Sequence, residues 1–188
     1  MTIRRIGTES SATRSRLLDI VEQLMISEGY AAVGVRRVAR EAGVTPALIN
    51  YYFPTLDDLL LAVLHRNAER ELESLREVAA SARPLHALWE RASHREGAVM
   101  TTEFLAMANH RKAIRDEIAA HALRSREAEL QIIAAALAGR DTDVPPVALT
   151  TLLAYIPRTF VLEEALGLTF GHPETLALVQ RYLNDLEA

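Results

Sequence analysis

The chain has 188 residues, close to half of them are apolar, and its formal net charge is −4 at pH 7. It has no cysteine, which excludes disulfides, thiolate metal sites and a cysteine nucleophile. No uncharged apolar run approaches the ~18 residues of a membrane span, and the first residues lack the apolar segment of a secretory signal. We therefore expect a cytoplasmic protein with no membrane partner and with one large core or two small ones.

The positive charge is almost all arginine, since Lys112 is the only lysine. Residues 1–60 contain seven arginines and seven acidic residues, so this part is neutral, whereas the rest of the chain is acidic. A negative net charge argues against a nucleic-acid partner. Arginine, however, suits bidentate contacts to phosphate or guanine, so a local DNA-binding surface remains compatible with the composition.

Apolar residues recur at helical spacing along the whole chain, without strand-like alternation of useful length. The predicted fold class is therefore all-α. Glycine, proline and polar joints divide the pattern into about nine helices, near residues 12–28, 34–42, 45–52, 55–81, 84–94, 97–108, 111–138, 146–169 and 173–187. Between Ile118 and Leu130 the apolar stripe is irregular, which would accommodate a break in that long helix.

The ends of the first four helices carry specific signals. Gly29 and Gly43 follow the first and second helices, where a left-handed residue commonly ends a helix. Thr45 can cap the third helix, with Pro46 at its first position. Pro54 ends this helix, and Thr55 can cap the fourth.

The second and third helices, joined by the segment EAGVT, have the form of a helix-turn-helix. In this motif the second helix enters the DNA major groove. We expect Val44, Ile49 and Phe53 to point inward. The residues predicted to face bases are Thr45, Pro46, Ala47, Leu48 and Asn50.

Each predicted contact has a chemical reason. Asn50 can pair with adenine, and Ala47 and Leu48 offer apolar contacts to thymine methyl groups. Arg36 could reach a guanine, whereas the tyrosine hydroxyls and the next arginines suit phosphates; these residues are Arg37, Arg40, Tyr51 and Tyr52. The ordinary alternatives are solvated surface arginines and a tyrosine pair that only packs.

Residues 17–64, LLDIVEQLMISEGYAAVGVRRVAREAGVTPALINYYFPTLDDLLLAVL, resemble the N-terminal domain of the TetR/AcrR family of bacterial transcriptional regulators. The matching motifs are the Gly29–Tyr30 pair, the RRVAREAGVT core and the ALINYYF recognition helix. The resemblance implies a helix-turn-helix DNA-binding domain at 1–54 and a ligand-binding and dimerisation domain at 55–188. It also implies a homodimer on near-palindromic double-stranded operator DNA, with no enzymatic activity and no cofactor.

Two positions depart from the family pattern. Leu56 stands where the family usually has a phosphate-binding lysine, and Gly34 replaces the usual Ser or Thr cap of the second helix. One lost phosphate contact would weaken binding and lower its salt dependence. Arginines of the N-terminal arm could compensate for it, namely Arg4, Arg5, Arg14 and Arg16.

The last two predicted helices are apolar on more than one face, which indicates a helix that is central in a core or shared between subunits. With the resemblance, we predict a dimer interface there that contains Leu149, Leu152, Leu153, Ile156, Leu176, Val179 and Leu183. An ordinary intrachain core is the alternative. Pro157 is expected to kink its helix.

The predicted ligand pocket uses large, adaptable side chains of the C-terminal region. These are Trp89, Met100, Phe104, Met107, Tyr155 and Phe160, and each of them could instead be plain core. Glu117 and His121 lie four residues apart, but we interpret this histidine as an ordinary surface residue rather than a metal ligand.

The sequence favours a ligand-responsive, dimeric DNA-binding regulator, a repressor released from its operator by a small, apolar effector. One alternative is a helical sensor or interaction protein of the same fold that has lost operator binding. A second alternative is a small all-α enzyme, for which the sequence offers no catalytic constellation.

Overall fold

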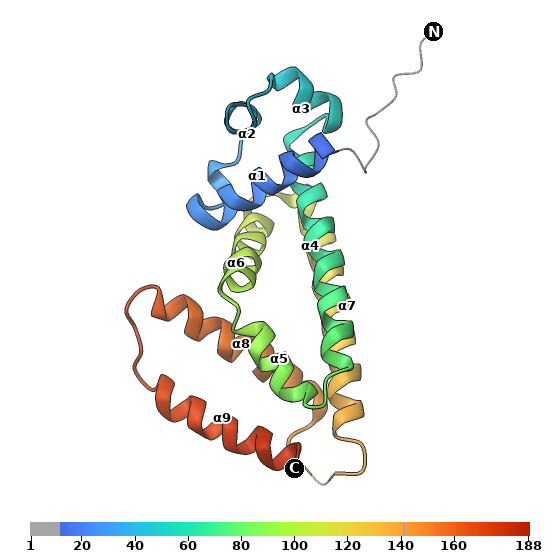
Figure 1. Cartoon of the computed structure of the whole chain (residues 1–188), viewed down its shortest axis with the longest axis vertical. Helices are drawn as coiled ribbons and strands as arrows, with labels where there is room; N and C mark the ends of the chain where they lie inside the picture. The colour runs from blue at the N-terminus through green and yellow to red at the C-terminus, as the bar shows by residue number, and fades with distance from the viewer. Residues whose placement is uncertain (1–11, 141) are drawn as a thin grey trace. The chain divides into compact units, whose positions relative to one another are not determined.

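The computed structural model describes residues 12–140 and 142–188; Arg4 and Arg5 of the expected basic arm lie outside these ranges. The described residues form nine α-helices and one short 3-10 helix, with no strand among them, which confirms the all-α prediction (Figure 1). The helices are α1 (Ala12–Glu28), α2 (Val35–Ala42), α3 (Pro46–Tyr52), α4 (Leu56–Ala79), α5 (Pro84–Ala92), α6 (Arg95–His110), α7 (Lys112–Ala136), α8 (Pro146–Glu164) and α9 (His172–Leu186), with η1 at Tyr30–Ala32.

One long helix lacks the break that its sequence would accommodate, and another helix is shorter than predicted. α7 is continuous across Ile118–Leu130, so the irregular apolar stripe there does not mark a break. α8 ends at Glu164 rather than near residue 169, because Gly167 adopts a φ of 77° and the N–H groups of Gly167 and Leu168 bond back to Glu164 and Glu163. This pair of hydrogen bonds is a Schellman motif, which satisfies the last carbonyls of the helix.

The chain packs as two compact units. Unit 1 comprises Met1–Ala68 and Met100–Ala119, and unit 2 comprises Glu69–Val99 and Ala120–Ala188. The residues of α4, α6 and α7 are therefore divided between the units. This division describes packing, and the functional boundary after residue 54 stays a prediction.

Unit 1 has a core of apolar side chains from all of its helices. Val21 and Met25 of α1, Val38 of α2, Ile49 of α3 and Leu60 of α4 are fully buried or nearly so. Met107 and Ile114 add the contributions of α6 and α7. The helix-turn-helix thus shares one core with residues 100–119.

The predicted cap of α4 is confirmed. The Thr55 hydroxyl accepts a hydrogen bond from the Asp58 N–H at 3.1 Å, and the Asp58 carboxylate accepts one from the Thr55 N–H at 2.9 Å. This reciprocal pair is a capping box with aspartate in the third helical position. It fixes where α4 begins, directly after Pro54.

Unit 2 has its own apolar core, built from α5, α7, α8, α9 and the second half of α4. The core contains Leu75, Leu85, Leu88, Ile133, Leu149, Leu153 and Leu183. Unlike unit 1, it also encloses charged and polar side chains of α7, among them His121, Ser125 and Glu129.

Candidate DNA-binding and ligand-binding sites

The turn between α2 and α3 is set by Gly43. Its φ of 66° and ψ of 32° lie in the left-handed region, where glycine carries no steric penalty. The Val44 N–H bonds to the Ala39 carbonyl at 2.9 Å, and the Gly43 N–H bonds to the Arg40 carbonyl at 3.2 Å. This Schellman motif turns the chain sharply enough for α3 to pack back on the domain.

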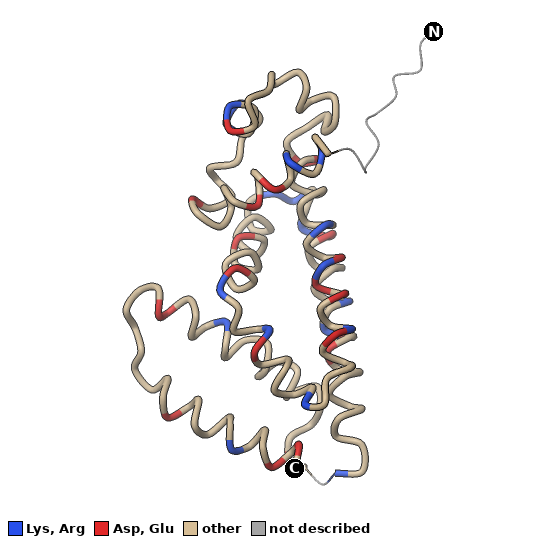
Figure 2. The backbone as a smooth tube through the Cα atoms, viewed as in Figure 1, with Lys and Arg blue, Asp and Glu red and all other residues tan. Residues whose placement is uncertain are grey.

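The helix α3 has a buried inner face and an exposed outer face, as the sequence predicts. Ile49 and Phe53 are buried in the core of unit 1, and Val44 packs against this core. The side chains of Thr45, Pro46, Ala47 and Asn50 are exposed, and Leu48 is half-buried. Figure 2 shows α3 without a charged residue, so its outer face offers polar and apolar contacts only.

The tyrosines at the end of α3 have different surroundings. Their rings meet edge to face with centroids 5.3 Å apart. Tyr51 is exposed, whereas Tyr52 is half-buried and packs against the core of unit 1. Tyr51 is therefore the more accessible of the two predicted phosphate contacts.

Thr45 stands at the N-cap position of α3, but its side chain makes no capping hydrogen bond. The predicted cap is therefore present in position and backbone conformation only. Because the side chain is also exposed, its hydroxyl is not committed to the helix.

The arginines of α2 differ in how firmly the protein holds them. Arg37 pairs with Glu28 at 2.7 Å and with Glu41 at 3.0 Å, and Arg40 lies 3.6 Å from Glu41. Arg36 is exposed and has no ion-pair partner among the described residues. Arg36 is thus the most readily available cation of α2.

The two departures from the family pattern have local consequences. Leu56 packs against the core of unit 1, so the first turn of α4 gains apolar contact where a lysine would project a charge. Gly34 caps α2 without a side-chain hydrogen bond. Arg14 and Arg16, which were predicted to belong to the N-terminal arm, instead lie in α1, and the Arg14 guanidinium lies over the Phe53 ring at 5.2 Å.

A residue that the sequence did not reveal ties α6 to the end of α1. The Glu103 carboxylate accepts a hydrogen bond from the Tyr30 N–H at 2.6 Å. Gly29 has a φ of 84°, and a Cβ there would lie 3.3 Å from the same carboxylate oxygen. The Gly29–Tyr30 pair of the family motif is therefore the point at which the end of α1 contacts α6 within unit 1.

The six predicted pocket residues do not form one group. Met100, Phe104 and Met107 belong to the core of unit 1. Trp89 and Phe160 contact each other edge to face in unit 2, with ring centroids 6.4 Å apart. Tyr155 is 48% exposed, and the Arg126 guanidinium lies 4.6 Å from its ring centre.

Unit 2 contains an open groove of about 550 Å³ that the sequence did not predict. Its walls come from the second halves of α4 and α7 and from the start of α5. The lining residues are Leu72, Leu75, Arg76, Ala79, Pro84, Ala128, Gln131, Ile132, Ala135 and Ala136. The groove is mainly apolar, and none of the six predicted pocket residues lines it.

The interior of unit 2 also holds a charged network. Arg91 of α5 donates to Glu129 at 2.5 Å and to Glu71 of α4 at 3.4 Å. His121 of α7 lies 2.8 Å from the other Glu71 oxygen. His121 is therefore buried rather than on the surface, and Glu117 instead lies 3.5 Å from His65.

The two carboxylates of this network are shifted in opposite directions. Burial raises the pKa of Glu129, and the charges of Arg91 and Arg126 only partly offset it. Burial alone would also raise the pKa of Glu71, but the hydrogen bond from His121 and the charge of Arg91 outweigh it and lower this pKa. The network favours an ionised Glu71 over an ionised Glu129.

The predicted dimer residues are split between the interior and the surface. Leu149, Leu153 and Leu183 are buried in the core of unit 2, and Ile156 and Val179 pack against it. Leu152 and Leu176 are 44% and 40% exposed. The accessible residues of the predicted interface are thus Leu152 of α8 and Leu176 of α9.

Comparison with known proteins connects this geometry to a family. Residues 17–63 match the family model described as bacterial regulatory proteins, tetR family. Over these residues the chain is similar to this family. The matched residues include the whole of α2 and α3, which form its helix-turn-helix.

A curated relative matches part of the chain. It is an uncharacterised HTH-type transcriptional regulator in the 5′ region of dhlA from Xanthobacter autotrophicus, 32% identical over 71 residues. The match covers 38% of this chain and 35% of the relative, about a third of its length.

Solved structures share the fold over nearly the whole chain. A TetR transcription regulator from Haloarcula marismortui is 22% identical with a TM-score of 0.71, covering 92% of this chain and 96% of that one. A protein described as a transcriptional regulator from Saccharomonospora viridis, in complex with choline, is 23% identical with a TM-score of 0.73, covering 92% and 93%. The ketosteroid regulator KstR2 of Mycobacterium tuberculosis is 15% identical with a TM-score of 0.65, covering 97% of each chain.

Two further features of the described residues concern a membrane span and a metal site. No single helix is long and apolar enough to span a bilayer; only α3 and α4 taken together have that length and composition, and they bend by 59° at their break. Within the same residues, no group of three or more His, Asp or Glu side chains could hold a metal ion.

Proposed function

We propose that the protein is a homodimeric transcriptional regulator that binds a near-palindromic operator through α2 and α3 and is released by a small molecule. The observation that carries this proposal is the division of α3. Ile49 and Phe53 lock its inner face into the core, which leaves Thr45, Ala47 and Asn50 exposed on a helix of fixed orientation. A rigid, exposed recognition helix is what readout in the major groove requires.

The contacts follow the accessibility of each side chain. Asn50 pairs with adenine, Arg36 with guanine, and Pro46, Ala47 and Leu48 provide apolar contacts to thymine methyl groups. Thr45 and Tyr51 contact phosphates or base edges through their hydroxyls. Arg37 and Tyr52 have secondary roles, because Arg37 must exchange two ion pairs for a phosphate and Tyr52 is half-buried.

The effector would bind in unit 2. Its groove of about 550 Å³ lies within the range of small-molecule sites, and its apolar lining suits an apolar ligand body. The similarity to a protein solved with choline supports ligand binding by this fold. Trp89, Tyr155 and Phe160 remain proposed ligand contacts in this unit, whereas Met100, Phe104 and Met107 would act through the core of unit 1.

The second copy in the dimer would cover exposed apolar side chains of α8 and α9, among them Leu152 and Leu176. Unpartnered apolar surface of this kind commonly marks an association site. We propose α4 as the element that couples ligand to DNA, because it contributes to both units and contains no glycine or proline. A regulator of this kind acts in the cytoplasm and needs no cofactor or enzymatic step.

Three observations favour the alternative of a sensor that has lost operator binding. The helix α3 has no charge, Leu56 replaces a phosphate-binding lysine, and Arg37 is already paired. Such a protein would keep the fold and the ligand site but would show no preference among DNA sequences.

The test measures binding of the full chain to DNA from upstream of its own coding sequence and to unrelated DNA. Asn50→Ala should cost roughly 1–3 kcal/mol on the upstream site and relax base preference at one position of each half-site. Tyr51→Phe should weaken binding about equally on all sequences. Asn109→Ala, an exposed asparagine on α6, is the matched control and should bind like the wild type. Equal affinity for upstream and unrelated DNA would favour the sensor alternative.

A further inference from the structure

A charged cluster inside unit 2 contains polar side chains besides those that form its ion pairs. Around the pairs that join Arg91 to Glu71 and Glu129, it includes His121 and Ser125 of α7 and Arg158 of α8. His121, Ser125 and Glu129 are spaced by four residues, so they lie on one face of α7, and all three are more than nine-tenths buried. Four helices thus direct polar side chains into one buried region.

Arg158 is the member of this cluster without a direct partner. Arg91 is held by two carboxylates, but Arg158 has no hydrogen bond or ion pair within 12–140 and 142–188, and its buried Nε is unpartnered. Burial lowers the pKa of Arg158, and the charges of Glu71 and Glu129 do not fully compensate. This half-buried arginine lacks the bidentate acceptor that arginine normally binds.

Other polar atoms of the cluster are also unsatisfied. Among the described residues, the Oγ of Ser125, the Nε of Arg91, the Nδ1 of His121 and the Oε2 of Glu129 are buried without hydrogen-bond partners. Buried polar groups are satisfied in most proteins, so a group of orphan atoms is a candidate place for a bound polar molecule. Ser125 and the two arginines donate, whereas the Glu129 oxygen accepts, so most of these atoms suit a ligand with acceptor oxygens.

The charges of the cluster specify the sign of the ligand. Arg91, Arg126 and Arg158 contribute three positive charges against the two carboxylates of Glu71 and Glu129. An excess of positive charge at low dielectric attracts an anion and repels a quaternary ammonium ion. This chain therefore differs in ligand chemistry from the relative of the same fold that was solved with choline.

We propose that the cluster binds the carboxylate of a small organic acid, with Arg158 as its bidentate partner and Ser125 as a further donor. As an effector site this inference rests on the proposed function, and it adds an anionic group to an apolar ligand body. The space beside Glu129, lined by Leu88, Ile133 and Leu153 among others, is too small to hold a water molecule. Binding must therefore move side chains of unit 2.

The single tryptophan provides a direct signal of such a movement. Trp89 is buried in unit 2, two residues before Arg91. Its fluorescence in the full chain, without DNA, can be titrated with straight-chain carboxylates of increasing length, their methyl esters and alkyltrimethylammonium ions. We expect the carboxylates to bind at least about tenfold more tightly than the matched esters.

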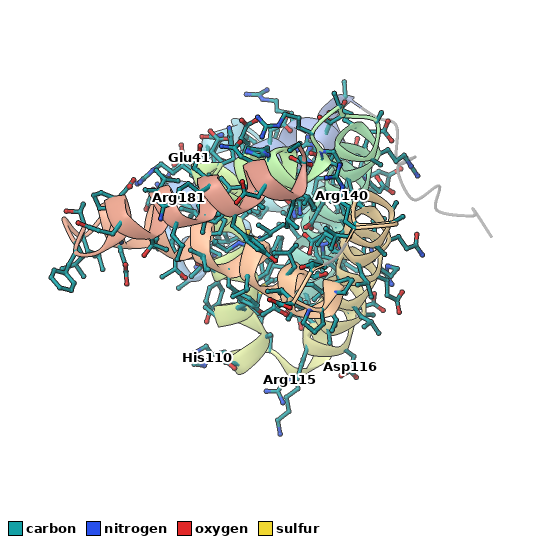
Figure 3. The ribbon with its side chains drawn as sticks, turned by 90° about the horizontal axis from the view of Figure 1, so that it is seen from below. Glu41, His110, Arg115, Asp116, Arg140 and Arg181 are labelled. Atoms are coloured by element: carbon teal, nitrogen blue, oxygen red, sulfur yellow. The ribbon has the colours of Figure 1, made fainter. Side chains whose placement is uncertain are left out.

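Substitutions test whether Arg158 causes the preference for carboxylates over esters. Arg158→Gln should weaken carboxylate binding at least about tenfold and leave ester binding unchanged. Arg181→Gln, an exposed arginine of α9 labelled in Figure 3, is the matched control and should bind carboxylates like the wild type. Without ligand, Arg158→Gln should melt no earlier than the wild type, because it removes a buried charge that has no partner.

Each outcome distinguishes the inference from the proposed function. Carboxylate preference that Arg158→Gln removes supports the site, even if no DNA sequence is bound. Equal binding of carboxylates and esters, tighter binding of the ammonium ions, or no carboxylate binding by the wild type overturns it, even if the protein binds its operator. Early melting of Arg158→Gln with unchanged carboxylate binding would also overturn it, because Arg158 would then be purely structural.

Discussion

Units 1 and 2 are both helical, but they bury different kinds of side chain. Among the described residues of unit 1, all side chains in the buried class are apolar, and the half-buried Arg66 is paired with Asp19 and Glu22. The polar groups predicted to contact DNA lie on the outside of α3. Unit 2 combines an apolar core with a charged cluster whose atoms are not all satisfied. A fully apolar core holds a recognition helix in one orientation, whereas an incompletely satisfied polar interior can change when a ligand arrives. We therefore propose that unit 1 fixes the orientation of α3 and that unit 2 responds to a ligand.

The largest effect should come from breaking the core of unit 1 beneath α3. Phe53→Ala removes a buried ring and should lower the free energy of unfolding by about 3–5 kcal/mol, with loss of operator binding. Phe170→Ala is the matched control, since this ring is fully exposed in unit 2 and its removal should change little. Chemical denaturation measures both variants. A loss below about 1 kcal/mol for Phe53→Ala would mean that α3 is not fixed by this core.

A smaller effect should separate the two carboxylates of unit 2. Glu71→Gln removes the ionised partner of Arg91 and His121 and should destabilise the protein by about 1–3 kcal/mol at pH 7. Glu129→Gln should change stability little or raise it, because burial disfavours the ionised form that it replaces. Equal losses for both variants would show that Glu129 stabilises the cluster as an ordinary ion pair.

The pH dependence of stability should differ in the same way. The raised pKa of Glu129 means that its contribution is present below the ordinary value of 4.5 and is lost as pH rises through its folded pKa. The lowered pKa of Glu71 means that its contribution is present above 4.5 and is lost as pH falls through its folded pKa. The free energy of unfolding, measured across acidic and neutral pH, should show that each Gln variant lacks the pH-dependent contribution of the carboxylate it replaces. A common pH profile for both variants would contradict the opposite shifts.

The smallest effect on folding should accompany loss of the dimer. Leu152→Glu places a charge on the exposed face of α8 and should give a monomer in sedimentation experiments without unfolding the protomer. Leu123→Glu, an exposed leucine of α7, is the control and should remain dimeric. If both variants remain dimeric, the interface lies outside the face that carries Leu152 and Leu176.

The sequence was sufficient for the fold class and for the helix-turn-helix because α2, α3 and the start of α4 carry clear local signals. Gly43 and the Thr55–Asp58 box are such signals, and the spacing of Ile49 and Phe53 fixes the buried face of α3 without any knowledge of distant residues. The resemblance at residues 17–64 pointed to the same helix-turn-helix. These features depend on neighbours in sequence, so one sequence predicts them.

The ligand region could not be predicted in the same way, because it depends on which helix faces which. Phe104 and Trp89 look alike as large apolar residues, yet they lie in the cores of different units. The irregular stripe between Ile118 and Leu130 was interpreted as a place for a break. The stripe is irregular because α7 has a buried polar face there, with His121, Ser125 and Glu129 at intervals of four residues.

The central claim is that a ligand in unit 2 controls the affinity of unit 1 for operator DNA. The most direct measurement is a calorimetric titration of the tightest-binding carboxylate into the full chain, with and without saturating operator. Linkage requires that operator weaken carboxylate binding by the same factor by which the carboxylate weakens operator binding, typically about 5–150-fold. We expect this reciprocal loss, and expect Arg158→Gln to abolish it. Equal carboxylate affinity with and without operator would contradict the claim, even if the protein binds both partners.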